Sequence, residues 1–193
     1  MKLSSFLLPF ICFFIISSCK DSPKKIIATT YNDTIHFFSI KDFFLSEIKD
    51  VEATPYFIYQ IHTKANGSKD STNFKKEAFT SFAQQFIACD VNSSSTKNQY
   101  IESAFKDNST NSITLNYSTL NNALLVQNID VLLNEETNKV TRIFVRQSLT
   151  NADSSTTILY SWKANKSCMV TTSIVKKDGT KYTEQQFVNW NDK

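Results

Sequence analysis

The spacing of apolar residues predicts a helix near residue 40. Four apolar residues share one helical face: Ile40, Phe43, Phe44 and Ile48. Ser39 and Asp42 form a capping signal, in which the Ser39 hydroxyl can accept an unpaired helix N–H. The helix must end before Pro55, because the residue that precedes a proline avoids the α-helical region.

The same periodicity predicts three further helices before residue 111. Thr54-Pro55 can open a short one, although the aromatic and β-branched residues from 56 to 61 also suit a strand. Asn73 can cap the next helix, whose apolar stripe runs from residue 79 to residue 87. The last helix is expected from residue 96 to residue 106, with apolar side chains on one face.

After residue 111 the apolar period shortens to two, which is the period of a half-buried strand. Polar turns at residues 134–138, 150–154 and 177–179 separate the alternating segments, which predicts five or six strands in an antiparallel meander. Helices come first and strands afterwards. The predicted fold is therefore a single α+β domain over residues 36–193, with N-terminal helices packed on one face of a C-terminal five- to six-stranded antiparallel meander sheet.

A different apolar pattern stands at the amino end. The uncharged run from Phe6 to Ile16 follows a single cation, Lys2, and has about half of the roughly 20 residues that a membrane-spanning helix needs. A short run of this kind, followed by small residues, is typical of a secretory signal. We predict that residues 1–18 are a signal peptide and that residues 19–35 are a polar tether.

The tetrapeptide Ile16-Ser17-Ser18-Cys19 resembles the lipobox of bacterial lipoproteins. The resemblance implies that the chain is cut before Cys19 and that Cys19 carries lipid, with acyl chains such as palmitate holding the protein to a membrane. Lys20 stands where the inner-membrane retention signal of enteric bacteria would place Asp, so an outer-membrane location is favoured and the leaflet is left open. An ordinary secreted protein with an incidental cysteine is the alternative.

Composition narrows the class of protein. The chain has 193 residues and a formal net charge of +3, and it has no basic motif interleaved with aromatic residues. This balance argues against a nucleic-acid partner. Only two glycines and three prolines are present, which excludes collagen-like and low-complexity chains.

Two cysteines remain once Cys12 leaves with the signal and Cys19 carries lipid. An oxidising envelope permits a disulfide between Cys89 and Cys168. Two buried free thiols are the alternative, and we favour it because Cys89 lies at the end of a predicted helix and Cys168 in a predicted strand.

No set of residues in the sequence forms a template for catalysis. His36 and His62 have neither the spacing nor the neighbouring cysteines of a zinc site, so no metal is expected. Glycine occurs only at positions 67 and 179, so a phosphate-binding loop cannot be assembled, and no cofactor is expected. We expect a protein that is not an enzyme.

The aromatic residues of the strands have two interpretations. Core packing explains most of them, because they share strand parity with Ile158 and Val188. Alternatively, a sheet face that helices leave uncovered could bind a glycan, a peptide or an acyl chain through amphipathic rings. The candidates for such a ligand face are Tyr160, Trp162, Tyr182 and Trp190.

A further resemblance, to Gram-negative envelope lipoproteins, runs from about residue 38 to residue 190. It rests on the segments at residues 54–56 (Thr-Pro-Tyr), 70–71 (Asp-Ser), 128–133 (Asn-Ile-Asp-Val-Leu-Leu) and 159–163 (Leu-Tyr-Ser-Trp-Lys). That group has no assigned activity, so the resemblance implies an envelope location and nothing about chemistry.

Three hypotheses for function follow. The first is a membrane-anchored, non-catalytic protein that binds or scaffolds an envelope partner at the outer membrane. The second is a carrier or receptor that holds an apolar or glycan ligand in a concave sheet. The third is an envelope enzyme. An apolar cavity under the sheet would favour the carrier. A filled sheet face with an exposed apolar patch would favour the scaffold, and a cleft with paired carboxylates would favour the enzyme.

Overall fold

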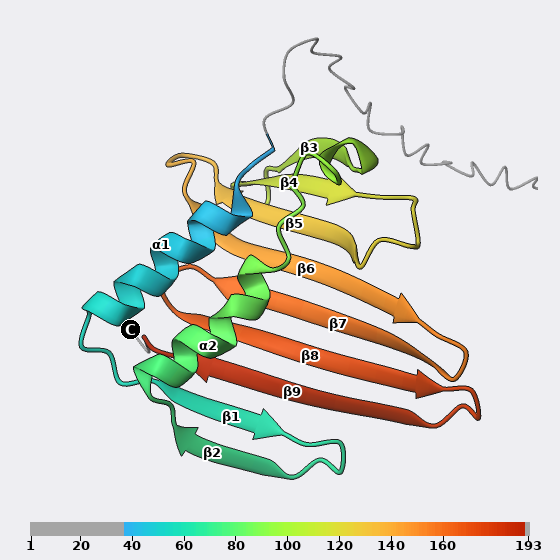
Figure 1. Ribbon diagram of the computed structural model, residues 1–193. Helices are drawn as coiled ribbons and strands as arrows, with labels where there is room; N and C mark the ends of the chain where they lie inside the picture. Colours follow the sequence, from blue (N-terminus) through green and yellow to red (C-terminus); the bar gives the residue numbers. More distant parts are fainter. Residues whose placement is uncertain (1–36, 192–193) are drawn as a thin grey trace, which may run out of the picture. The chain divides into compact units, whose positions relative to one another are not determined.

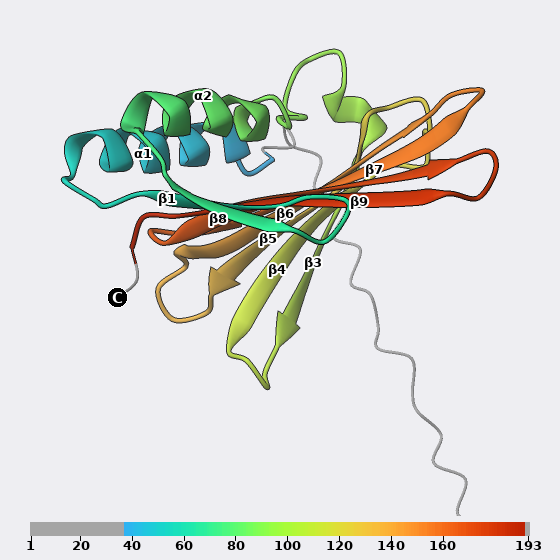
Figure 2. The same ribbon diagram turned by 90° about the horizontal axis from the view of Figure 1, so that it is seen from below.

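A computed structural model describes residues 37–191 of the chain. These residues form one nine-stranded antiparallel sheet and two α-helices. Figure 2 shows both helices on the same side of the sheet, which we call the covered face, while the opposite face, the open face, carries no helix. The helices are α1 (Ile40–Ala53) and α2 (Lys76–Ile87), and a 3-10 turn, η1, spans Lys97–Gln99.

The strands follow one another as a meander from β3 to β9, and the early hairpin β1–β2 is added beside β9. The order across the sheet is β2-β1-β9-β8-β7-β6-β5-β4-β3, so β2 and β3 are its two edges. The bounds are β1 (Tyr59–Thr63), β2 (Lys69–Asn73), β3 (Ile101–Asp107), β4 (Ser112–Ser118), β5 (Val126–Asn134), β6 (Val140–Thr150), β7 (Ser154–Lys163), β8 (Ser167–Lys176) and β9 (Lys181–Asn189).

The predicted fold class is wrong. The sheet has nine strands rather than five or six, and the described residues contain two α-helices rather than four, so the sheet dominates the domain. The helix expected after Pro55 is strand β1, which pairs with β9 along its whole length. The helix expected from residue 96 to residue 106 is replaced by η1 and the edge strand β3. In both segments pairing with a neighbouring strand overrode a short helical pattern.

Local signals account for the two helices that do form. Ser39 is the N-cap of α1, and its hydroxyl accepts from the Asp42 N–H at 3.3 Å. The helix ends at Ala53, ahead of Pro55 as expected. The predicted cap of the second helix is wrong, because Asn73 is the last residue of β2 and α2 starts at Lys76 after Lys75, which makes no side-chain cap.

The core lies between the helices and the covered face, on residues of one strand parity. Two rows cross the sheet in register: Tyr117, Ile129, Val145, Tyr160 and Val170, and Val131, Ile143, Trp162, Cys168 and Val188. All of these side chains are buried. Figure 1 shows that the helices cover one end of the strands, while the β6–β7 and β8–β9 hairpins extend beyond them.

Candidate functional site

Three of the four candidate ligand-face aromatics belong to the core. Tyr160, Trp162 and Trp190 are buried beneath the helices. Tyr182 has the same strand parity but lies towards the β8–β9 turn, where it is 40% exposed and the Lys176 ammonium sits 5.0 Å from its ring centroid. The structure therefore does not bring the four rings together as an open ligand face.

Aromatic rings fill the space between the helices and the sheet. Trp162 is fully buried, and its ring centroid lies 5.2 Å from Phe44 of α1, 5.0 Å from Phe86 of α2 and 5.2 Å from Trp190. Phe79 of α2 packs against Trp190 at 5.3 Å. Rings at these separations are in contact, so the covered face is packed core.

A half-buried carboxylate ties α1 to the β7–β8 turn. The Glu47 carboxylate accepts from Trp162 Nε1 at 3.1 Å and from the Asn165 N–H at 2.7 Å, both at Oε2. Burial raises the pKa of Glu47, and the two hydrogen bonds partly offset that rise. The two donors, the Trp162 indole and the Asn165 backbone, are both held in place by the sheet. The role of Glu47 is therefore to position α1.

The two cysteines are free, buried thiols, so the disulfide between Cys89 and Cys168 is not present. Cys89 belongs to a buried polar chain. The Tyr160 hydroxyl donates to Gln147 Oε1 at 3.2 Å, Gln147 Nε2 donates to Cys89 Sγ at 3.3 Å, and the thiol donates to the Gln85 carbonyl at 3.3 Å. Burial raises the pKa of Cys89 to about 12 and also raises that of Cys168. Neither is placed as a nucleophile, which would need a lowered pKa.

Within residues 37–191, no group of histidine, cysteine and carboxylate side chains could hold a metal ion. His62 Nε2 lies 3.8 Å from Glu184 Oε2, too far for a hydrogen bond. No helix in this range is both long and apolar enough to cross a bilayer. His36, Cys19, the predicted signal peptide and the predicted tether lie outside the described residues.

One register row of the open face has an apolar half and a polar half. The apolar half runs from Ile61 through Phe187 and Met169 to Ser161 and Phe144. These side chains are half-buried, and the rows on either side of them are mostly polar.

The same row continues into amides and a carboxylate. Asn116 Nδ2 donates to Asn128 Oδ1 at 2.9 Å and to Asp130 Oδ1 at 2.7 Å, and Asn128 Nδ2 donates to Asp130 Oδ2 at 2.9 Å. Both carboxylate oxygens of Asp130 thus accept a side-chain amide N–H within the cluster. The apolar half is therefore the part of the open face best suited to contact a partner.

A hollow with a volume of about 750 Å³ lies between the β4–β5 connection and the end of β6. The buried Gln127 amide fixes that connection by donating to the carbonyls of Asn121 and Leu124. The apolar walls are Leu120, Leu125 and Leu149, all exposed, and the polar walls include Arg146, Ser148 and Thr150.

Sequence reasoning gave no role to this hollow. Only the apolar run at residues 123–126 between polar neighbours could have drawn attention to it.

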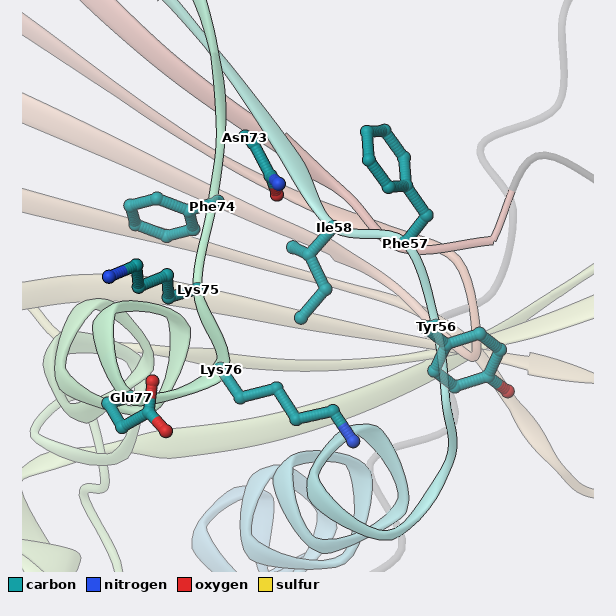
Figure 3. A pocket seen from close by; sticks show the side chains of 8 residues that line it. All are labelled: Tyr56, Phe57, Ile58, Asn73, Phe74, Lys75, Lys76 and Glu77. Carbon is teal, nitrogen blue, oxygen red and sulfur yellow. The ribbon is translucent and has the colours of Figure 1, made fainter.

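A second, shallower hollow of about 360 Å³ opens where the α1–β1 connection meets the start of α2 (Figure 3). Phe57, 70% exposed, stands at one side of it, and Glu77 lies on the α2 side. Lys76 crosses to α1, where its ammonium donates to the carbonyls of Glu52 and Thr54 at 2.8 and 2.7 Å. Lys76 thereby caps the carboxyl end of α1, which is a structural role.

Comparisons with protein families, with curated proteins and with solved structures found no match to this chain.

Proposed function

We propose that the protein is a lipid-anchored, non-catalytic binding protein of the bacterial cell envelope, held at the outer membrane through Cys19. One observation carries the binding role: aromatic rings fill the covered face, with Trp162 fully buried among Phe44, Phe86 and Trp190. A domain whose interior is full recognises partners with its outer surface. The apolar half of the open-face row is the surface that we assign to an envelope partner.

The serines of the open face allow a matched test. Ser161 lies in the middle of the apolar half, between Met169 and Phe144, whereas Ser173 lies on the same face nearer the β8–β9 turn. Ser161→Lys places a charge on the proposed contact surface without removing any apolar side chain, and Ser173→Lys is the control. Intact cells are treated with a cross-linker, and the complexes are isolated through the anchored protein.

We expect the same partner to be recovered with wild type and Ser173→Lys, and recovery with Ser161→Lys to fall by about tenfold, because a charge would be buried in the contact. Equal recovery with Ser161→Lys, or no partner with wild type, would count against the proposal.

The hollow beside β6 supports a second candidate function, a receptor for a small amphipathic ligand. Its volume of about 750 Å³ lies in the range of small-molecule sites, and it combines three leucines with the cation of Arg146. A fatty acid has the matching chemistry, an apolar chain and a carboxylate. Calorimetric titration with a soluble fatty acid tests this role. Saturable binding that is lost in Arg146→Gln would support it, and no heat of binding would exclude it.

A further inference from the structure

The edge strand β3 has an unusual composition for the border of a sheet. It has seven residues, of which all but Asp107 are exposed. Ile101 and Phe105 are 64% and 56% exposed, and both lie on the open face. Long edge strands with exposed apolar residues are sites for pairing with another strand.

The opposite edge shows how this protein protects a border. The edge strand β2 has five residues, all polar and all exposed. Its Asp70 forms an ion pair with Lys64 at 2.6 Å on the β1 side of the hairpin. A short, polar edge discourages pairing with other chains. β3 has no such protection on its open-face side, because Ile101 and Phe105 project there.

We propose that β3 pairs antiparallel with β3 of a second copy of this chain, around a twofold axis at Ala104. The periodicity of a strand limits the choices, because a continuous sheet must keep residues of one parity on one face. The twofold axis between two copies of the same strand must therefore pass through a residue position and cannot pass between two residues. Only Ala104, the central residue of β3, pairs all seven residues.

Charge complementarity selects the same register. With the axis at Ala104, Glu102 lies opposite Lys106 of the second copy. On the other side of the axis, Lys106 lies opposite Glu102 of the second copy. Moving the axis to Ser103 or Phe105 would place Ala104 opposite one of these charges instead. Opposite charges that face each other across strands stabilise the pair.

The existing contacts of these two residues hold them in place for this role. The Glu102 carboxylate accepts from the Tyr117 hydroxyl at 2.8 Å, which leaves its other oxygen available. The Lys106 ammonium forms an ion pair with Glu135, and its remaining donors can reach a second carboxylate.

The apolar residues fit the same register. Phe105 lies opposite Ser103 of the second copy, where a small side chain leaves room for the ring. Ile101 lies opposite Asp107 of the second copy and diagonal to Phe105 of that copy, within reach of its aromatic ring. Pairing thus covers the two exposed apolar residues of β3 from both copies, and it does not depend on the identity of any other envelope partner.

Disulfide trapping of the full-length chain in detergent tests the register directly. Ala104→Cys places two thiols opposite each other across the twofold axis, within reach of a disulfide. Ser103→Cys is the matched control, because two residues at position 103 would lie roughly 8 Å apart, beyond that reach. Wild type, which keeps its own cysteines, gives the background. We expect oxidation to yield covalent dimers with Ala104→Cys only. Dimers with Ser103→Cys, or none above background with Ala104→Cys, would overturn the proposal.

Charge reversal provides an independent test by measuring the dimer dissociation constant. Glu102→Lys alone and Lys106→Glu alone each create two like-charge contacts, so each should weaken dimerisation by about tenfold. Mixing the two single variants restores both opposite-charge pairs in the heterodimer. A chain that carries both substitutions restores the two pairs in its homodimer. We expect affinity to return in both cases. A mixture that associates no better than either variant alone would contradict the pairing.

Discussion

Two buried tryptophans differ in one hydrogen bond, which makes them a matched pair. Trp162 Nε1 donates to Glu47, whereas Trp190 Nε1 has no acceptor among the described residues. Phenylalanine at either position removes an indole from the core. Trp162→Phe also removes a donor from a half-buried carboxylate, so we expect it to lower the free energy of unfolding by about 1–2 kcal/mol more than Trp190→Phe.

Urea denaturation of both variants measures this difference. Equal losses would show that the hydrogen bond to Glu47 adds nothing to stability.

The environment of the two thiols predicts their reactivity. Cys89 and Cys168 are buried and free, and burial raises the pKa of both. Because the thiolate is the reactive species, a maleimide should leave both unmodified in the folded protein at neutral pH and label both in denaturant. Ala152→Cys, at an exposed position of the β6–β7 turn, serves as the positive control. Native labelling of Cys89 or Cys168 at the rate of that control would contradict the packing described above.

At the scale of elements, we predict that Glu47 makes the docking of α1 depend on pH. Burial raises the pKa of Glu47, so the folded state holds its proton more tightly than the unfolded state does. The free energy of unfolding that this group contributes therefore falls as the pH rises from the ordinary carboxyl pKa through the raised value. Glu47→Gln keeps an oxygen acceptor for Trp162 and Asn165 without the charge.

We expect Glu47→Gln to equal wild type in acid, where Glu47 is neutral, and to exceed the stability of wild type at neutral pH. Urea denaturation across that pH range checks this. A variant less stable than wild type by the same amount at every pH would show that the charge is not the cause.

The elements that sequence reasoning missed are those decided by long-range pairing. Residues 56–61 suited both a helix and a strand, and pairing with β9, more than a hundred residues away, settled the choice as β1. Tyr100, Ile101, Ala104 and Phe105 have helical spacing, yet β3 pairs with β4 over seven residues. An edge strand is exposed on both faces, so it lacks the clean alternation that marked the strands from 113 onwards.

At the scale of the molecule, the meander from β4 to β9 was predictable from the sequence, but the addition of β1, β2 and β3 to the sheet was not. Alternation and polar turns located the strands from β4 to β9, because each contact there is local. Nothing local indicates that β1 returns to pair with β9 and enlarges the sheet. Strand parity placed Tyr160 and Trp162 on the same face as Ile158, and in the structure that face also carries Ile143 and Val145. Parity alone does not reveal which face the helices cover.

The proposed function rests on a lipid anchor at Cys19, and native mass spectrometry of the full chain, extracted in detergent from the membranes of cells that make it, measures that anchor directly. We predict a chain that begins at Cys19 and carries covalent acyl groups. A Cys19→Ala chain should lack the acyl mass. A chain that begins elsewhere, or a Cys19 without lipid, would contradict the proposal.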